Sequence, residues 1–184
     1  MKYDTLNFKD LPKDLISEGN PRIKIYGSQN HSRRRFRDPN GKLFYKIWDN
    51  DYVRRNNLPD ALDAEFYDEK LIPAFRALIH GENDVCMGYI MAVMEKGSIP
   101  PDKDFLQHIM KKTRQSKYFF YDFWRASIME YEGKLCLIDL ESVYPVCEYE
   151  FRKKQNIEKY NQNGHLIKNP DYRKFMEKLY TDIC

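Results

Sequence analysis

Short strand-like runs separated by turn signals follow a polar segment in the first quarter of the chain. Residues 23–26 alternate and end at a glycine, and residues 33–37 form a second candidate strand. The segment 38–41, Asp-Pro-Asn-Gly, is a strong turn signal, and 42–48 is then the returning strand. The pattern predicts an antiparallel meander of three strands, preceded over residues 1–20 by an arm or a short capping helix.

In the middle of the chain, the spacing of apolar residues changes from that of strands to that of a helix. Apolar residues from 61 to 78 recur at mostly helical spacing, and Pro73 is expected to kink or split that helix. After a loop at 80–84, residues 85–94 are almost wholly apolar, which is typical of a buried strand. The polar, proline-containing segment 95–101 breaks the pattern and is the best candidate for a hinge between two lobes.

Helical and hairpin patterns fill the remainder. Residues 102–117 predict a helix, and 127–140 predict a hairpin whose turn is Glu132-Gly133. Further helices are expected at about 150–159 and 170–180. Together these patterns predict an α+β fold with one lobe over residues 1–96 and a mainly helical lobe over residues 97–184.

Composition limits the class of protein without fixing its function. The 184 residues are 42% hydrophobic and 15% aromatic, which is enough for a folded domain or two small lobes. No apolar run approaches the roughly 18 residues of a membrane span, and the N-terminus lacks the apolar core of a signal peptide. We therefore expect a soluble cytoplasmic protein with no membrane partner. The cysteines and histidines are widely scattered, so neither a disulfide framework nor a zinc site is predicted.

Asp139 is the most informative residue for chemistry. It follows the apolar run 135–138, and Glu141 lies two positions later, on the same side of an extended chain. An ionised carboxylate at the exit of a buried strand needs a partner or a metal ion, and carboxylates suit hard cations such as Mg²⁺. The alternative, a solvated turn after a core strand, stays open.

Lys46 and Asp122 are the other chemical candidates. Lys46 lies within the apolar strand 42–48, where it is placed to hold phosphates if an acid on the following helix fixes it. Glu65 is the expected partner and Glu69 the alternative, although Lys46 at an outward-facing edge position explains the residue equally well. Asp122, between two aromatic residues, is placed to act as a general base, or as an ordinary loop acid bound to backbone amides.

The sequence contains, in this order, a strand lysine, a helix glutamate, a loop aspartate and a strand-end aspartate. With these parts in this order, the chain resembles the protein-kinase-like superfamily. The likeness is closest to the compact branch that includes aminoglycoside phosphotransferases and choline-type small-molecule kinases. It covers about residues 22–145 and implies a two-lobed fold, ATP as nucleotide and Mg²⁺ as metal. By this resemblance Lys46 binds the phosphates, Glu65 is the glutamate that pairs with Lys46, Asp122 is the base and Asp139 binds the metal. The segment Met94-Glu95-Lys96 is then the hinge that faces the adenine.

The chain also departs from that pattern. The expected glycine-rich loop is reduced to Gly27-Ser28 followed by bulky and basic residues. Ser127 stands where the family has a metal-binding asparagine, so the expected metal ligands are Asp139 with Ser127 or Glu141. The histidine that usually precedes the loop aspartate is absent, and few residues follow Glu141.

Three functional readings remain. The first is an ATP- and Mg²⁺-dependent phosphotransferase with an unknown small-molecule or protein acceptor. The second is a pseudokinase, which keeps the fold, binds nucleotide weakly or not at all, and acts by binding another protein. The third is a nucleic-acid or acidic-partner binder built on the basic segment 33–37. A net charge of only +3 disfavours nucleic acid.

Overall fold

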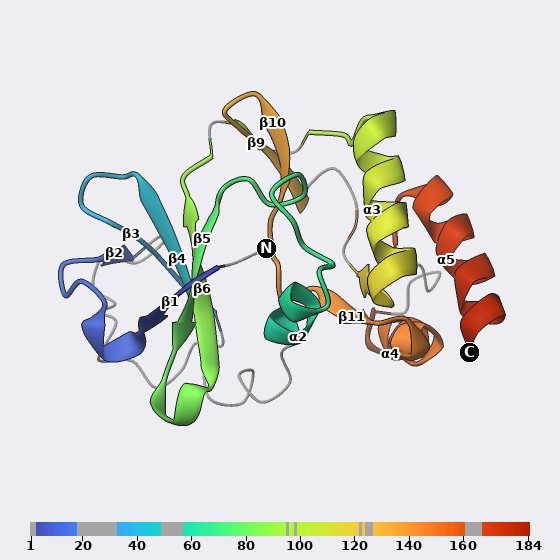
Figure 1. The fold of residues 1–184 in the computed structure, drawn as a ribbon, viewed down its shortest axis with the longest axis horizontal. Coiled ribbons are helices and arrows are strands. Elements are labelled where there is room, and N and C mark those ends of the chain that lie inside the picture. Colours follow the sequence, from blue (N-terminus) through green and yellow to red (C-terminus); the bar gives the residue numbers. More distant parts are fainter. Residues whose placement is uncertain are drawn as a thin grey trace. The chain divides into compact units, whose positions relative to one another are not determined.

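The computed structural model divides the chain into two compact units, which are described separately. Unit 1 comprises residues 57–73 and 95–184 together with Met1, and unit 2 comprises residues 2–56 and 74–94. Figure 1 shows the elements of both. The structure describes residues 3–17, 33–48, 57–94, 96–97, 99–121, 123, 127–160 and 167–184.

Unit 2 is built on a six-stranded sheet in the order β1-β5-β6-β4-β3-β2 (Figure 1). The parallel pair is β1 with β5, and every other neighbouring pair is antiparallel. In chain order the strands are β1 (Asp4–Asn7), β2 (Ile16–Ser17), β3 (Arg33–Arg37), β4 (Leu43–Trp48), β5 (Phe75–His80) and β6 (Cys86–Ala92), with short 3-10 turns η1 (Phe8–Asp10) and η2 (Glu82–Asp84).

The hairpin of β3 and β4 confirms the predicted strands and turn. The Asp38 carboxylate accepts a hydrogen bond from the Leu43 amide, and Gly41 takes a φ of 67°, which suits glycine. The prediction for residues 1–20 was wrong in part, because Asp4–Asn7 is a strand paired in parallel with β5 rather than an arm or helix. The expected strand at 23–26 lies outside the described residues.

One face of this sheet carries the apolar core of unit 2. Its buried members come from four strands and from the N-terminal segment: Leu11, Leu15, Phe36, Tyr45, Ile47, Ala77, Ile79 and Ile90. Gly88, on the central strand β6, lies so close to β4 that a Cβ atom there would overlap the carbonyl oxygen of Lys46. The glycine therefore permits the close pairing of the two strands.

Unit 1 combines helices with short sheets. One sheet has the order β10-β9-β7, from β7 (Lys96–Gly97), β9 (Ile128–Tyr131) and β10 (Lys134–Leu137), and a second pairs β8 (Tyr118–Phe120) with β11 (Val143–Pro145). The helices are α2 (Leu58–Asp63), α3 (Lys103–Ser116), α4 (Tyr149–Tyr160) and α5 (Pro170–Ile183), with the 3-10 turn η4 (Val146–Glu148) before α4. The buried hydroxyls of Thr113 and Tyr172, 2.8 Å apart, join α3 to α5.

Most elements predicted for this half are confirmed. Asp102 caps α3 by accepting a hydrogen bond from the Phe105 amide at 2.7 Å. Glu132 and Gly133 both have positive φ, 49° and 72°, as the two-residue turn of a tight hairpin requires. The helices α4 and α5 fall at the predicted places.

The helix predicted for residues 61–78 is present only over its first residues and was wrong beyond Asp63. The helix α2 ends at Asp63, and Glu65 takes a left-handed φ of 57°. The Phe66 amide then donates to Ala61 and the Glu65 amide to Leu62, which is the Schellman pattern of a helix end. The chain continues through turns into the strand β5.

The division of the chain also differs from the expected boundary at residue 96. The segment 57–73 groups with the C-terminal residues, whereas the unit boundary at Met94 coincides with the start of the predicted hinge. The fold is mixed α+β with a mostly antiparallel main sheet, in agreement with the predicted class. A kinase-like arrangement of two lobes stays a proposal.

The sequence predicted no membrane partner. Over the part of the chain that the structure describes, no helix is both long enough and apolar enough to cross a bilayer. A cytoplasmic location stays a prediction.

Candidate functional site

Asp139 lies on a sharply turned segment directly after β10. Its φ of 55° is left-handed, which carries a conformational cost for any residue with a side chain. Its carbonyl accepts a hydrogen bond from the Ser142 amide at 2.8 Å, so residues 139–142 form a turn. Five other described residues with side chains also have a positive φ, so the turn is the first candidate because it carries the acid that follows a buried strand end.

Three backbone hydrogen bonds connect the residues around Asp139 to other segments of unit 1. Before the turn, the Leu137 amide donates to Leu71 at 2.8 Å, and the Ile138 amide donates to Ser127 at 3.0 Å. After the turn, the Ser142 carbonyl accepts from the Tyr121 amide at 2.7 Å. These bonds come from segments far apart in the sequence, so the position of Asp139 is fixed by tertiary structure.

Tyr67 supports the same turn from within the core. Its side chain is completely buried, and its hydroxyl donates to the Leu140 carbonyl at 2.7 Å. Burial, and then the negative charge of Glu141, raise the pKa of Tyr67 well above its usual value. The hydroxyl therefore keeps its proton at neutral pH and remains a donor.

The three predicted metal ligands differ in accessibility. Asp139 is partly exposed, whereas Ser127 and Glu141 are only 1% and 2% exposed. Among the residues whose placement is described, no three His, Cys, Asp or Glu side chains converge on one point. Mg²⁺ commonly binds through one or two carboxylates and completes its shell with water and phosphate oxygens. Asp139 therefore fits such an ion, and a cage made of protein ligands alone is not present in this part.

Asp122, the predicted base, lies outside the described residues, but the residues on either side of it, Tyr121 and Phe123, are described. Tyr121 is tied to Ser142 in the Asp139 turn. The buried ring of Phe123 packs edge-on against Tyr172, with their centroids 4.9 Å apart. The chain on either side of position 122 is therefore anchored in unit 1.

Lys46 lies in unit 2 and is buried, with 2% exposure. It alternates along β4 with Tyr45 and Ile47, whose side chains join the apolar core, so Lys46 belongs to the opposite face. Its ammonium nitrogen lies 5.9 Å from the ring centroid of Tyr89, its neighbour on β6. This burial excludes the alternative in which Lys46 points outward into water.

The remaining predicted residues are spread over both units. Glu65 is exposed, lies beyond the end of α2 and belongs to unit 1, so its pairing with Lys46 stays a prediction. Met94 ends unit 2 and is partly exposed, and Lys96 begins β7, opposite Glu130 of β9. Three further predicted residues lie outside the described part of the chain: Gly27, Ser28 and Glu95.

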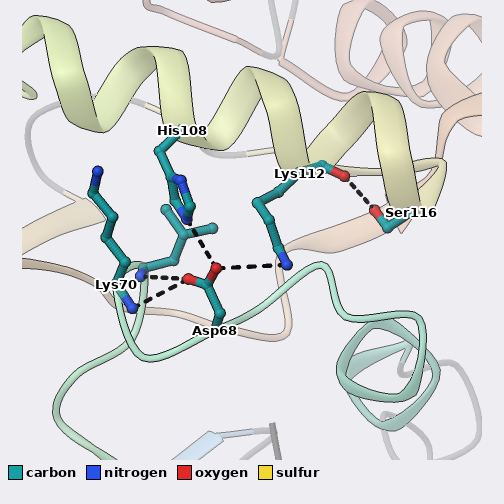
Figure 2. A network of polar contacts seen from close by, with 6 residues as sticks. Asp68, Lys70, His108, Lys112 and Ser116 are labelled. Atoms are coloured by element: carbon teal, nitrogen blue, oxygen red, sulfur yellow. Dashed lines mark hydrogen bonds and ion pairs between the residues drawn. The ribbon is translucent and has the colours of Figure 1, made fainter.

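Sequence reasoning missed the polar network around Asp68 (Figure 2). One carboxylate oxygen of Asp68 lies 2.9 Å from His108 Nε2 and 3.5 Å from Lys112 Nζ, both on α3. The other oxygen accepts hydrogen bonds from the Lys70 and Leu71 amides, each at 3.1 Å. The network fastens the turn segment after α2 to the helix α3.

The electrostatics of Asp68 follow from these contacts. Partial burial alone acts to raise its pKa, but the hydrogen bond with His108, the Leu71 amide and the positive charges on α3 outweigh burial. The pKa of Asp68 is therefore lowered, and the carboxylate stays ionised at neutral pH. Since Leu71 accepts from Leu137, Asp68 also steadies the strand that leads to Asp139.

Comparison of the sequence with models of known protein families, and with curated proteins, finds no match. The candidate residues therefore depend on the chain's own geometry within each unit. Unit 1 holds the partly exposed Asp139 on a turn fixed by backbone hydrogen bonds, and unit 2 holds the buried Lys46 in its sheet.

Proposed function

We propose that this chain is an ATP- and Mg²⁺-dependent phosphotransferase of protein-kinase-like fold. The observation that supports this most is the left-handed turn at Asp139, a partly exposed residue that follows the buried Cys136 and Leu137 at the end of β10. A carboxylate held in one position suits a metal ion that must be placed accurately for phosphoryl transfer. Asp139 is accordingly the proposed metal ligand.

Lys46 is the proposed phosphate-binding residue. Its side chain lies on the face of β4 opposite the apolar core, and by the kinase-like resemblance the lysine of this strand contacts the nucleotide phosphates. Asp122 is the proposed base, which would accept the proton of the acceptor hydroxyl. When bound, Mg²⁺ would neutralise negative charge on the nucleotide phosphates. The acceptor, in this proposal, is a small molecule or a protein in the cytoplasm.

A specific observation favours a second candidate, a pseudokinase that acts as a protein-binding module. Glu141 and Ser127 are almost fully buried, so Asp139 alone among the three predicted ligands is accessible. A single accessible carboxylate binds Mg²⁺–nucleotide weakly when the remaining ligands are water and phosphate. Nucleotide affinity separates the two candidates.

The first experiment is nucleotide binding, measured by calorimetry and thermal shift with ATP, with and without Mg²⁺. We expect Mg²⁺-dependent stabilisation of the wild type, about 1.4 kcal/mol at ten times Kd, and its loss in Asp139→Asn. The matched control is Asp182→Asn, which removes an exposed carboxylate near the end of α5 and should bind as the wild type does. No stabilisation at millimolar nucleotide would contradict the phosphotransferase and leave the pseudokinase.

A second pair of variants tests the lysine. Lys46→Met keeps the length of the side chain but removes the charge, and we expect nucleotide binding to weaken whether or not Mg²⁺ is present. Lys178→Met, at an exposed position on α5, is its control. Equal nucleotide affinity in both variants would remove Lys46 from the proposed site.

A further inference from the structure

Two of the four cysteines are exposed and belong to, or directly follow, elements that pack against each other. Cys147 lies in η4, Cys184 follows the last residue of α5, and both are exposed free thiols. Cys86 and Cys136 are free but buried. The wide spacing of cysteines in the sequence predicted no disulfide, and spacing alone gives no sign that these two meet.

The packing of η4 against α5 brings the two cysteines into the same region of unit 1. These elements pack against each other, and the Tyr149 and Tyr180 rings lie 6.0 Å apart by their centroids. The Cys184 amide donates to the Tyr180 carbonyl at 2.9 Å, so Cys184 continues the last turn of the helix. The nearby Cys147 side chain raises the pKa of the Cys184 thiol, with a smaller contribution from burial.

We propose that Cys147 and Cys184 are a site of reversible oxidation, at which a peroxide joins the two thiols in an intramolecular disulfide. The bond would fasten the C-terminal end of α5 to η4. Thiols that the fold already holds in one region of the protein lose less further freedom on bonding than two separate molecules do, which favours closure over the capture of a second molecule.

The reaction balances with hydrogen peroxide as the oxidant. One thiolate attacks a peroxide oxygen, the O–O bond breaks, and the departing hydroxide takes a proton to give water and a sulfenic acid. The second sulfur then attacks the sulfenic sulfur, the S–S bond forms, and the S–O bond breaks to release a second water. Two thiols and one peroxide give one disulfide and two waters, and a reducing thiol reverses the modification.

Burial makes the reaction selective for this pair. Burial raises the pKa of Cys86 to about 11, which keeps that thiol protonated and unreactive. Cys136 is fully buried, and its thiol donates to the Leu137 carbonyl. Within the described residues no third His, Cys, Asp or Glu side chain completes a metal site with the pair, so oxidation is the chemistry that the two thiols support best.

The test is oxidation of the folded wild type with dilute hydrogen peroxide, followed by intact mass and peptide mapping. We expect a loss of two hydrogens, a crosslink between the peptides of Cys147 and Cys184, and reversal by a reducing thiol. Cys147→Ser and Cys184→Ser each keep the other three cysteines, so either change should abolish the intramolecular disulfide. A crosslink that survives in either variant would overturn the proposal.

A second measurement compares the folded and unfolded chain. Equilibration with reduced and oxidised glutathione gives the effective concentration of one thiol at the other. We expect this value to be at least about tenfold higher in the folded protein than in concentrated denaturant, because folding already places the thiols together. An equal or lower value, or only mixed disulfides and intermolecular dimers, would show that the pair is not preorganised.

Discussion

Replacing Tyr67 by phenylalanine removes one buried hydroxyl and retains the ring. The ring's edge-on contact with Phe66, with their centroids 4.8 Å apart, should persist, so the change isolates the hydrogen bond to Leu140. Losing a hydrogen bond in the core, and leaving its acceptor without that donor, costs about 1–3 kcal/mol. For a chain of this size each kcal/mol lowers the melting temperature by roughly 2–4 °C.

The assay is urea unfolding of wild type and Tyr67→Phe, followed by fluorescence at several pH values. Because burial raises the pKa of Tyr67 in the folded state, its stabilising contribution is fully present below the unfolded pKa of about 10. The difference between the two proteins should therefore be constant from pH 6 to 8.5. It should shrink above about pH 10, where the unfolded wild type gains stability by ionising.

The matched control is Tyr180→Phe, at a partly exposed tyrosine of α5, which should change the free energy of unfolding by less than about 0.5 kcal/mol. If Tyr67→Phe behaves like this control, the Tyr67 hydroxyl does not stabilise the Asp139 turn and the reasoning fails. If the site is correct, Tyr67→Phe should also weaken the Mg²⁺-dependent part of nucleotide binding.

Two further predictions follow from single contacts. Asp68→Asn should lower the free energy of unfolding by about 1 kcal/mol at pH 5.5, after allowance for the partial exposure of the ion pair. Since folding lowers the pKa of Asp68, this difference should shrink as urea titrations are taken below about pH 4 and through the folded pKa, and a difference that did not change over this range would rule out the ion pair as its source. Gly88→Ala should destabilise unit 2 by several kcal/mol, because its methyl group would overlap the Lys46 backbone. Gly41→Ala meets no atom within 4 Å and should cost only about 1 kcal/mol for its left-handed φ, so thermal denaturation that gave equal losses would contradict the steric argument.

The elements that were predictable are those whose signals are local. The hairpin of β9 and β10 follows from Glu132-Gly133 between two apolar runs, and the helix α3 follows from Asp102 and the apolar positions behind it. In both cases the turn or cap residue forms the interaction that its side chain or backbone favours. Local chemistry and tertiary structure agree at these places.

The segment after α2 shows why periodicity failed. Its apolar residues have helical spacing because turns also bury a residue every three or four positions. Asp68 bends the chain by accepting from the Lys70 and Leu71 amides, and aspartate is favoured in such turns. The parallel pairing of β1 with β5 could not be predicted either. It joins residues about 70 positions apart, and neither strand has a local sequence pattern that indicates its partner.

The candidate site was predictable only in part, for the same reason. Asp139 follows from an apolar run that ends in an acid, a pattern visible within a few residues. Tyr67 contacts Leu140 across 73 positions and Asp68 contacts His108 across 40, so sequence alone gives no reason to connect them. The only local hint was the tendency of an aspartate before Glu-Lys-Leu to start a turn.

The backbone conformation at Asp139 allows a last test of whether its carboxylate contributes to the stability of the fold or to metal binding. Asparagine and glycine tolerate a left-handed φ at least as well as aspartate, so the conformation does not require a charge. If the charge serves metal binding, Asp139→Asn should be as stable as the wild type in the absence of ligand, while losing Mg²⁺-dependent nucleotide binding. If the charge serves the fold, Asp139→Asn should lose about 1 kcal/mol or more before any ligand is added. The second result would make Asp139 a structural residue and would take away the observation on which the phosphotransferase proposal depends most.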